Sequence, residues 1–267
     1  MFEKLPLIIG HRGASAFLPE NTIEAFRMAF EKFRADMIEF DVHTAKNGVP
    51  VVIHDATLER TTNGRGYISD WTSAELKKFD AGFYFKNTNQ DDFPERAKGH
   101  RIPTLEEVFI HFPGRKLSIE IKEKSAELTH SVIRLVKKYK AEEICVVGSK
   151  HDLVSKTMRD AYPSIYRFYS KKEIVRGFFD FKQKSKAKKE NLAVASMPLQ
   201  SCGMAFDNQG FMDYLHEKGV KSFFWTINDP TAISSLYQKK ADGIITDKPD
   251  LARTVIGRTN ETGPTTV

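Results

Sequence analysis

Short apolar runs alternate with amphipathic stretches along most of the chain, and this alternation predicts strands followed by helices. The apolar runs are typical of strands buried on both faces, as in a parallel sheet. Eight such strands are expected at residues 5–10, 36–42, 116–122, 143–149, 165–170, 192–197, 220–227 and 241–247. Helices are expected at residues 21–33, 104–112, 127–139, 152–162, 171–185, 208–219, 231–240 and 249–257. Asn21 or Thr22 is placed to cap the first helix, and the cap is the preferred role for Asn21.

Eight strand–helix units in 267 residues predict a single α/β domain of the (β/α)8, or TIM barrel, type rather than an open doubly wound sheet. Residues 50–55 follow an Asn-Gly turn and should pair back on the second strand as a hairpin. Residues 56–101 interrupt the rhythm, and we expect a small cap insertion there with one helical stretch near residues 72–79. The domain is predicted to span residues 1–257, and the polar tail 258–267 is expected to be disordered.

Composition narrows the class of protein. The chain is 40% hydrophobic and 28% charged, as in a globular protein with a sizeable core. Its net charge of +6 is mildly basic, which suits an anionic ligand without requiring a nucleic acid. Two distant cysteines make a disulfide framework or a thiolate metal site unexpected.

The strongest charge run, residues 182–189, is expected to be solvated surface. It lacks interleaved aromatic residues, so we predict no nucleic-acid partner, and weak contact with an anionic membrane is the alternative role. Because no apolar run reaches about 18 residues and no secretion signal is apparent, we expect no transmembrane segment and a cytoplasmic location.

Charged and polar side chains gather where the predicted strands end, which is the active-site face of a TIM barrel. These residues are His11, Arg12, Glu39, Asp41, His54, Glu120, Lys122, Trp225 and Asp247. Residues two apart on a strand share a face, so Glu39 and Asp41 should project together, as should Glu120 and Lys122.

The three carboxylates of Glu39, Asp41 and Glu120 would repel one another unless a cation lay between them. Oxygen ligands favour one divalent ion, Mg²⁺ or Ca²⁺, with Mn²⁺ as a further candidate. Arg12 and Lys122 are then available to hold an anion beside the metal, and a phosphate group suits that combination.

Two histidines complete the candidate site. His11 and His54 could act as a general acid and a general base, because imidazole titrates near neutral pH. His43 shares the face of the two acids, but a position at the rim is expected for it. Asp247 is expected to cap the last helix or to orient Lys122.

Six segments together resemble the glycerophosphodiester phosphodiesterase family. They read GHRGASAFLPENTIEAF, ADMIEFDVHTAKNGVPVVIHDATLERTTNGRG, IPTLEEVF, LSIEIK, WTIND and ADGIITDKP, and they cover nearly the whole chain. The resemblance implies a TIM barrel with a small cap after the second strand. It also implies hydrolysis of glycerophosphodiesters to sn-glycerol 3-phosphate and an alcohol, in lipid or glycerol metabolism.

Carried over by position, the resemblance assigns metal binding to Glu39, Asp41 and Glu120 and catalysis to His11 and His54. It assigns phosphate contact to Arg12 and Lys122. Trp225 is expected either to pack against the substrate's glycerol carbons or to plug the barrel.

Two questions of function stay open at this point. The segment 171–206 does not align firmly with the family, so the preferred alcohol is undecided. A lysophospholipase D or another phospholipase-type phosphodiesterase on the same fold is the alternative enzyme. A catalytically silent anion-binding protein is the alternative of another class, although no histidine or metal ligand of the pattern is missing.

Overall fold

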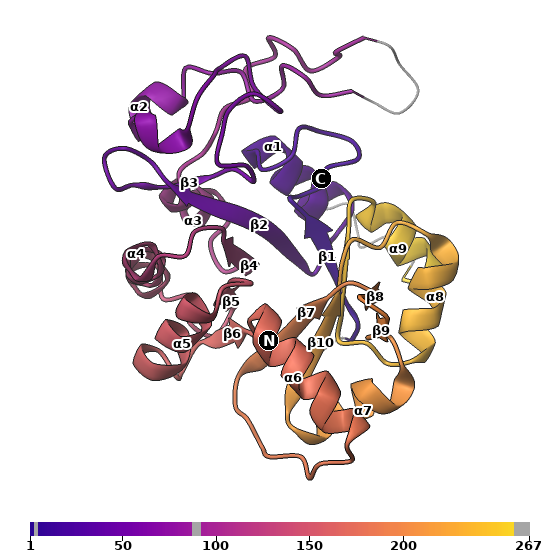
Figure 1. Ribbon diagram of the computed structural model, residues 1–267. Coiled ribbons are helices and arrows are strands. Elements are labelled where there is room, and N and C mark those ends of the chain that lie inside the picture. The colour runs from indigo at the N-terminus through magenta and orange to yellow at the C-terminus, as the bar shows by residue number, and fades with distance from the viewer. Residues whose placement is uncertain (3–4, 87–91, 259–267) are drawn as a thin grey trace.

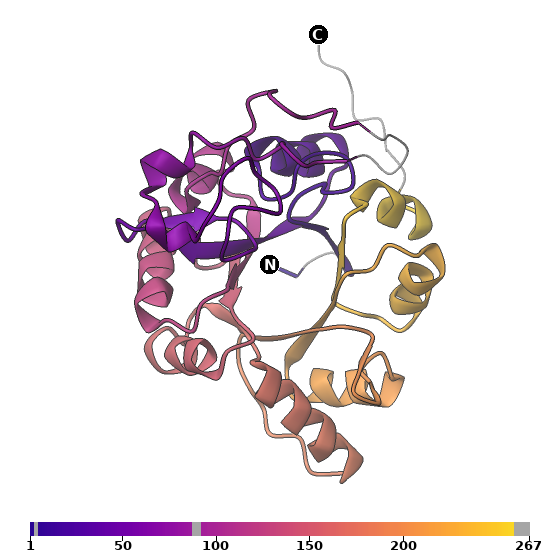
Figure 2. The same ribbon diagram turned by 45° about the horizontal axis from the view of Figure 1, so that its top comes forward.

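Eight parallel strands close into a ring that helices surround (Figures 1 and 2). The computed structural model describes residues 1–2, 5–86 and 92–258. Pairing of β1 with β2, from Ile9–Met37 to His11–Glu39, closes the ring, and the predicted TIM barrel is confirmed. The ring strands are β1 (Leu7–His11), β2 (Met37–Thr44), β4 (Lys116–Ile121), β5 (Cys145–Gly148), β6 (Tyr166–Phe168), β7 (Ala193–Met197), β10 (Val220–Phe224) and β11 (Gly243–Thr246).

The strands are apolar throughout because both of their faces are buried. In β1, Leu7 and Ile9 belong to the cluster that fills the barrel, whereas Ile8 packs outward against the helices. This alternation follows the two-residue period of a strand. The inner cluster also contains Phe168 and Phe223, so a packed floor lies beneath the open end of the barrel.

Helices cover the outside of the ring between successive strands (Figure 2). They are α1 (Ile23–Arg27), the π-helical η1 (Met28–Lys32), α3 (Leu105–His111), α4 (Ala126–Lys138), α5 (Asp152–Ala161), α6 (Lys171–Lys182), α7 (Gln209–Glu217), α8 (Pro230–Gln238) and α9 (Pro249–Val255). Among the described residues, no helix has the length and apolar character needed to cross a bilayer.

The first helix differs from its prediction. Thr22 is its N-cap, and the Thr22 hydroxyl accepts a hydrogen bond from the Ala25 amide. The preferred cap role of Asn21 is therefore wrong. Asn21 has a φ of 60°, a left-handed conformation that asparagine tolerates, and its side chain points elsewhere.

The insertion after β2 is built on a hairpin and carries a small core of its own. Strand β3 (Pro50–Val52) pairs antiparallel with β2, as predicted. The insertion contains η2 (Ile68–Asp70) and α2 (Ser73–Leu76), and Leu58 and Leu76 are buried beneath them. Figure 1 shows these segments stacked at one end of the molecule.

A second hairpin was not predicted. Strands β8 (Gln200–Ser201) and β9 (Met204–Ala205) pair antiparallel after β7, within the segment 171–206. The predicted disorder of the tail concerns residues 258–267, of which 259–267 lie outside the described residues. Arg258 is described, and its guanidinium donates a 2.8 Å hydrogen bond to Asp36.

His100 ties the insertion to α1. Its ring lies 3.2 Å from Glu24 Oε2 and 2.8 Å from Glu95 Oε2. The hydrogen bond with Glu24, followed by that with Glu95, outweighs burial and raises the pKa of His100 above its usual range. A histidine whose pKa is raised on folding contributes stability below the pKa of the unfolded chain, and this contribution is lost as pH rises through the folded pKa.

We therefore predict that His100→Gln lowers the free energy of unfolding at about pH 6 and has a smaller effect at about pH 9. Urea denaturation at both pH values measures this difference, with exposed His111→Gln as the control. Equal losses for His100→Gln at the two pH values would contradict the assigned ion pairs.

Candidate active site

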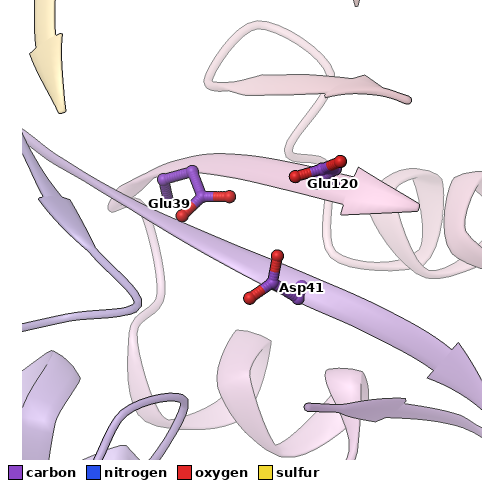
Figure 3. A group of neighbouring side chains, drawn as sticks. All are labelled: Glu39, Asp41 and Glu120. Atoms are coloured by element: carbon purple, nitrogen blue, oxygen red, sulfur yellow. The ribbon is translucent and has the colours of Figure 1, made fainter. Parts of the chain in front are cut away.

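Three carboxylates meet at the carboxyl ends of two neighbouring strands. Glu39 and Asp41 lie two residues apart on β2, and Asp41 pairs in register with Glu120 on β4. Figure 3 shows the three side chains converging from the two strands. One oxygen from each lies within 4.8 Å of the others. Pairing in register and the two-residue strand period together produce this convergence.

The acidic cluster is buried and only partly neutralised. Burial, followed by the Asp41 charge, raises the pKa of Glu39 to about 8. Glu39 Oε2 has no hydrogen-bond partner among the described residues. Lys122 Nζ lies 2.9 Å from Asp41 Oδ1 and 2.8 Å from Glu120 Oε2. An orphaned buried carboxylate oxygen beside two further acids fits a hard divalent cation.

Asp41 occupies the centre of the cluster and has the most partners. Asn21 Nδ2 donates a 2.9 Å hydrogen bond to Asp41 Oδ2, and Arg12 Nε lies 3.2 Å from the same oxygen. Burial would raise the pKa of Asp41, but Lys122 and Arg12 outweigh it and lower that pKa. Asn21 thus holds a carboxylate of the candidate site instead of capping a helix.

His11 projects from the end of β1 and is held by Asp247. Its Nδ1 donates a 2.7 Å hydrogen bond to Asp247 Oδ1, which also accepts one from the Ser15 hydroxyl, while Asn228 Nδ2 donates to Asp247 Oδ2. Burial alone would lower the pKa of His11, but the bond to Asp247 and the Glu39 charge outweigh it and raise that pKa.

The expected roles of Asp247 are wrong. The cap of α9 is Lys248, without a side-chain hydrogen bond, and within the described residues Lys122 forms no hydrogen bond or ion pair with Asp247. Its hydrogen bonds instead hold His11 in place.

His54 approaches from the hairpin return. Its Nδ1 donates a 2.6 Å hydrogen bond to Asp55 Oδ1, and its carbonyl accepts one of 3.1 Å from His43 Nε2. Burial lowers the pKa of His54, and the attraction of Asp41 and Asp55 does not reverse this. His43 is only 7% exposed, so the rim position expected for it is wrong.

The local environments of the two candidate catalytic histidines therefore shift their pKa values in opposite directions. The pKa of His11 is raised and that of His54 is lowered, and both rings line one cavity. Two titratable groups with diverging pKa values are the usual arrangement of a general acid and a general base. As the pH falls, His11 is therefore protonated before His54.

A chain of ion pairs links His54 to Arg12 through the insertion. Asp55, which holds His54, also accepts a hydrogen bond from Arg60 Nε. Arg60 Nη1 and Nη2 donate to both oxygens of Glu20 at 2.8 and 2.7 Å. Glu20 Oε1 in turn accepts a 2.8 Å bond from Arg12 Nη1. The Arg60 guanidinium thereby holds both Asp55, which contacts His54, and Glu20, which contacts Arg12.

A cavity of about 540 Å³ opens above these groups. His11, Arg12, Glu39, His54, Glu120 and Lys122 line one part of it. The remainder extends along β5–β7 to the β8–β9 hairpin. Lys150 and Lys171 line it, and the apolar part of its wall is formed by Phe168, Tyr169, Ile174, Val175, Met204 and Phe206. Trp225 also lines the cavity and is 44% exposed, so it does not plug the barrel.

Comparison with known proteins decides the family. The glycerophosphoryl diester phosphodiesterase family matches residues 11–251. This chain belongs to that family. The match includes every residue predicted for the site. The chain is therefore an enzyme of the phosphodiesterase class, as the sequence motifs indicated.

Individual relatives agree with this membership. The enzyme is 32% identical to a glycerophosphodiester phosphodiesterase of Caldanaerobacter subterraneus, over 91% of this chain and 95% of the relative. It is 29% identical to human lysophospholipase D GDPD1, over 92% of this chain and 84% of the relative. A phosphodiesterase of Oleispira antarctica, solved in complex with the product sn-glycerol-3-phosphate, superposes with a TM-score of 0.76. The two are 24% identical, and 95% of this chain and 97% of that chain are covered.

Sequence reasoning missed the residues that hold the site together. Glu20, Asp55 and Arg60 were not selected, although Asp55 directly follows His54 and was visible as a potential partner. Arg60 gave no such signal, because its role depends on how the insertion folds back over β1.

Arg60→Gln should lower the turnover of a glycerophosphodiester by about 10- to 100-fold, because loss of an outer hydrogen-bond partner commonly has that effect. A glutamine cannot bridge Asp55 and Glu20 at once. Steady-state kinetics measures the loss, and Arg65→Gln is the matched control, since Arg65 is an exposed cation of the same insertion. Equal activity of the two variants would mean that the bridge does not position the site.

Proposed function

We propose that the enzyme hydrolyses glycerophosphodiesters to sn-glycerol 3-phosphate and an alcohol in a reaction that requires a divalent cation. The observation that carries this proposal is one cavity lined by Glu39, Glu120, two cations and two histidines with opposite pKa shifts, with Asp41 buried beside the two acids. The product bound to the Oleispira antarctica relative supports it.

Glu39, Asp41 and Glu120 would hold the cation, and the orphaned Glu39 oxygen supports this assignment. Mg²⁺ or Ca²⁺ suits an all-oxygen site, and Mn²⁺ is the further candidate. When bound, such an ion stabilises negative charge on phosphoryl oxygens. Arg12 and Lys122 would bind the phosphate from beside the cluster, because both cations line the cavity next to it.

The histidines would move the protons. His54, with its lowered pKa, would accept a proton from the attacking hydroxyl group. His11, with its raised pKa, would donate a proton to the departing alcohol oxygen. Trp225 lines the same cavity and would pack against carbons of the substrate. Two routes fit this division: direct attack by water, or attack by the glycerol 2-hydroxyl followed by opening of a cyclic phosphate. Trapping of a cyclic product would distinguish them.

Treatment with EDTA should abolish hydrolysis of glycerophosphocholine, and added Mg²⁺, Ca²⁺ or Mn²⁺ should restore it. His54→Ala should lower kcat by about 100-fold or more at saturating metal, because a positioned base contributes about that much. Release of glycerol 3-phosphate measures both effects. Full activity in EDTA, or an unchanged His54→Ala variant, would refute the proposed chemistry.

A second candidate activity is that of a lysophospholipase D, which cleaves the corresponding bond when the glycerol carries an acyl chain. The apolar wall formed by β6, α6 and the β8–β9 hairpin favours it, because apolar surface binds a hydrocarbon chain. The human relative bears this name.

Turnover of lysophosphatidylcholine beside glycerophosphocholine tests this candidate. If the apolar wall binds an acyl chain, the lysolipid should show the lower KM, and Phe206→Ala should raise that KM by about tenfold while leaving the glycerophosphocholine value unchanged. Hydrolysis of glycerophosphocholine alone would exclude the second candidate.

A further inference from the structure

Three consecutive barrel strands each deliver a lysine to the same cavity. Lys122 follows β4, Lys150 follows β5 and Lys171 follows β6, and all three line the cavity wall. Lys122 forms ion pairs with Asp41 and Glu120 of the acidic cluster. The other two lysines lie where the cavity extends away from the cluster, so their positive charges face a different part of any bound substrate.

Lys150 and Lys171 are unpaired. Neither ammonium group has a hydrogen-bond or ion-pair partner within residues 1–2, 5–86 and 92–258. The Lys171 amide donates a 3.1 Å hydrogen bond to the Lys150 carbonyl, which joins the two loops that carry the lysines. The backbone therefore holds two uncompensated cations side by side at the cavity mouth, while their side chains stay free to reach a ligand.

Within the described residues, no carboxylate forms an ion pair with either of these two cations. Of the described residues that line the cavity, Glu39 and Glu120 are the acids, and both belong to the cluster assigned to the divalent cation. The phosphodiester group carries one negative charge, which Arg12, Lys122 and that cation already face. The glycerol half of the substrate is uncharged, so a negative charge beyond the phosphate can only belong to the alcohol half.

We propose that Lys150 and Lys171 form a subsite that selects phosphodiesters whose alcohol carries a second anionic group, a phosphate or a carboxylate. This inference rests on the proposed function and names its substrate class. It also orients a glycerophosphodiester, with the alcohol over β5–β7 and the glycerol towards β1 and β11. This is the reverse of the orientation in which the apolar wall would bind the acyl chain of a lysolipid, so the subsite belongs to the first of the two candidate activities. A cationic alcohol such as choline is disfavoured, because two ammonium groups repel it even though Trp225 could stack against it.

Binding and turnover of three matched esters of glycerol 3-phosphate test the proposal. Their alcohols are glycerol, which is neutral, glycerol phosphate, which is anionic, and choline, which is cationic. Calorimetry measures binding to His54→Ala, with and without Lys150→Gln and Lys171→Gln, at a fixed free Mg²⁺ concentration. Turnover is measured for the same lysine variants in the wild-type background. Lys189→Gln is the matched control, because Lys189 is exposed and does not line the cavity.

The glycerol phosphate ester should bind about tenfold more tightly than the glycerol ester, and the choline ester should bind most weakly. The double lysine variant should lose this order and keep its affinity for the neutral ester within about twofold. Raising the salt concentration should shrink the preference, since exposed charges are screened. Lys189→Gln should retain it.

Equal binding of the neutral and anionic esters, a preference that survives in the double variant, or no binding of the anionic ester would each overturn the proposal. Failure of the proposed function would give a different result from failure of the subsite. Charge-selective binding without turnover would refute the function and leave the subsite standing, whereas turnover of all three esters without charge preference would refute the subsite alone.

Discussion

The mutual repulsion of three carboxylates at the open end of the barrel is the constraint on which the site depends. Glu39 and Asp41 are almost fully buried, and the pairing of β2 with β4 brings Glu120 beside them. Lys122 and Arg12 relieve part of that repulsion, but burial and then the Asp41 charge still raise the pKa of Glu39 to about 8. A fold rarely retains a buried carboxylate oxygen without a partner, such as Glu39 Oε2, unless a ligand uses it, and a divalent cation is the ligand that suits three acids.

The barrel and its insertion each position a different part of the site. The barrel strands fix the acids, His11 and Lys122, because His11 and the acids lie on buried strands and Lys122 directly follows β4. The insertion supplies Arg60, which joins the supports of His54 and Arg12. Opposite environments then separate the two histidines: the hydrogen bond to Asp247 and nearby negative charge raise the pKa of His11, and burial lowers that of His54.

Strand order and the acidic cluster could be predicted from sequence, because both follow from local periodicity. Apolar runs mark strands, and a spacing of two places Glu39 and Asp41 on one face. The roles of Asn21 and Asp247 could not be predicted in this way, since each depends on a partner that is distant along the chain, Asp41 and His11 respectively. The β8–β9 hairpin was missed for a related reason, because two-residue strands leave no periodic signal.

The most direct test of the shared cation is a crystal structure of the enzyme soaked with Mn²⁺ and sn-glycerol 3-phosphate, with anomalous scattering used to locate the metal. The account predicts one anomalous peak among the carboxylates of Glu39, Asp41 and Glu120, with the phosphate adjoining it between Arg12 and Lys122. A metal bound elsewhere, or a phosphate seated in the cavity with no metal at the three acids, would contradict it.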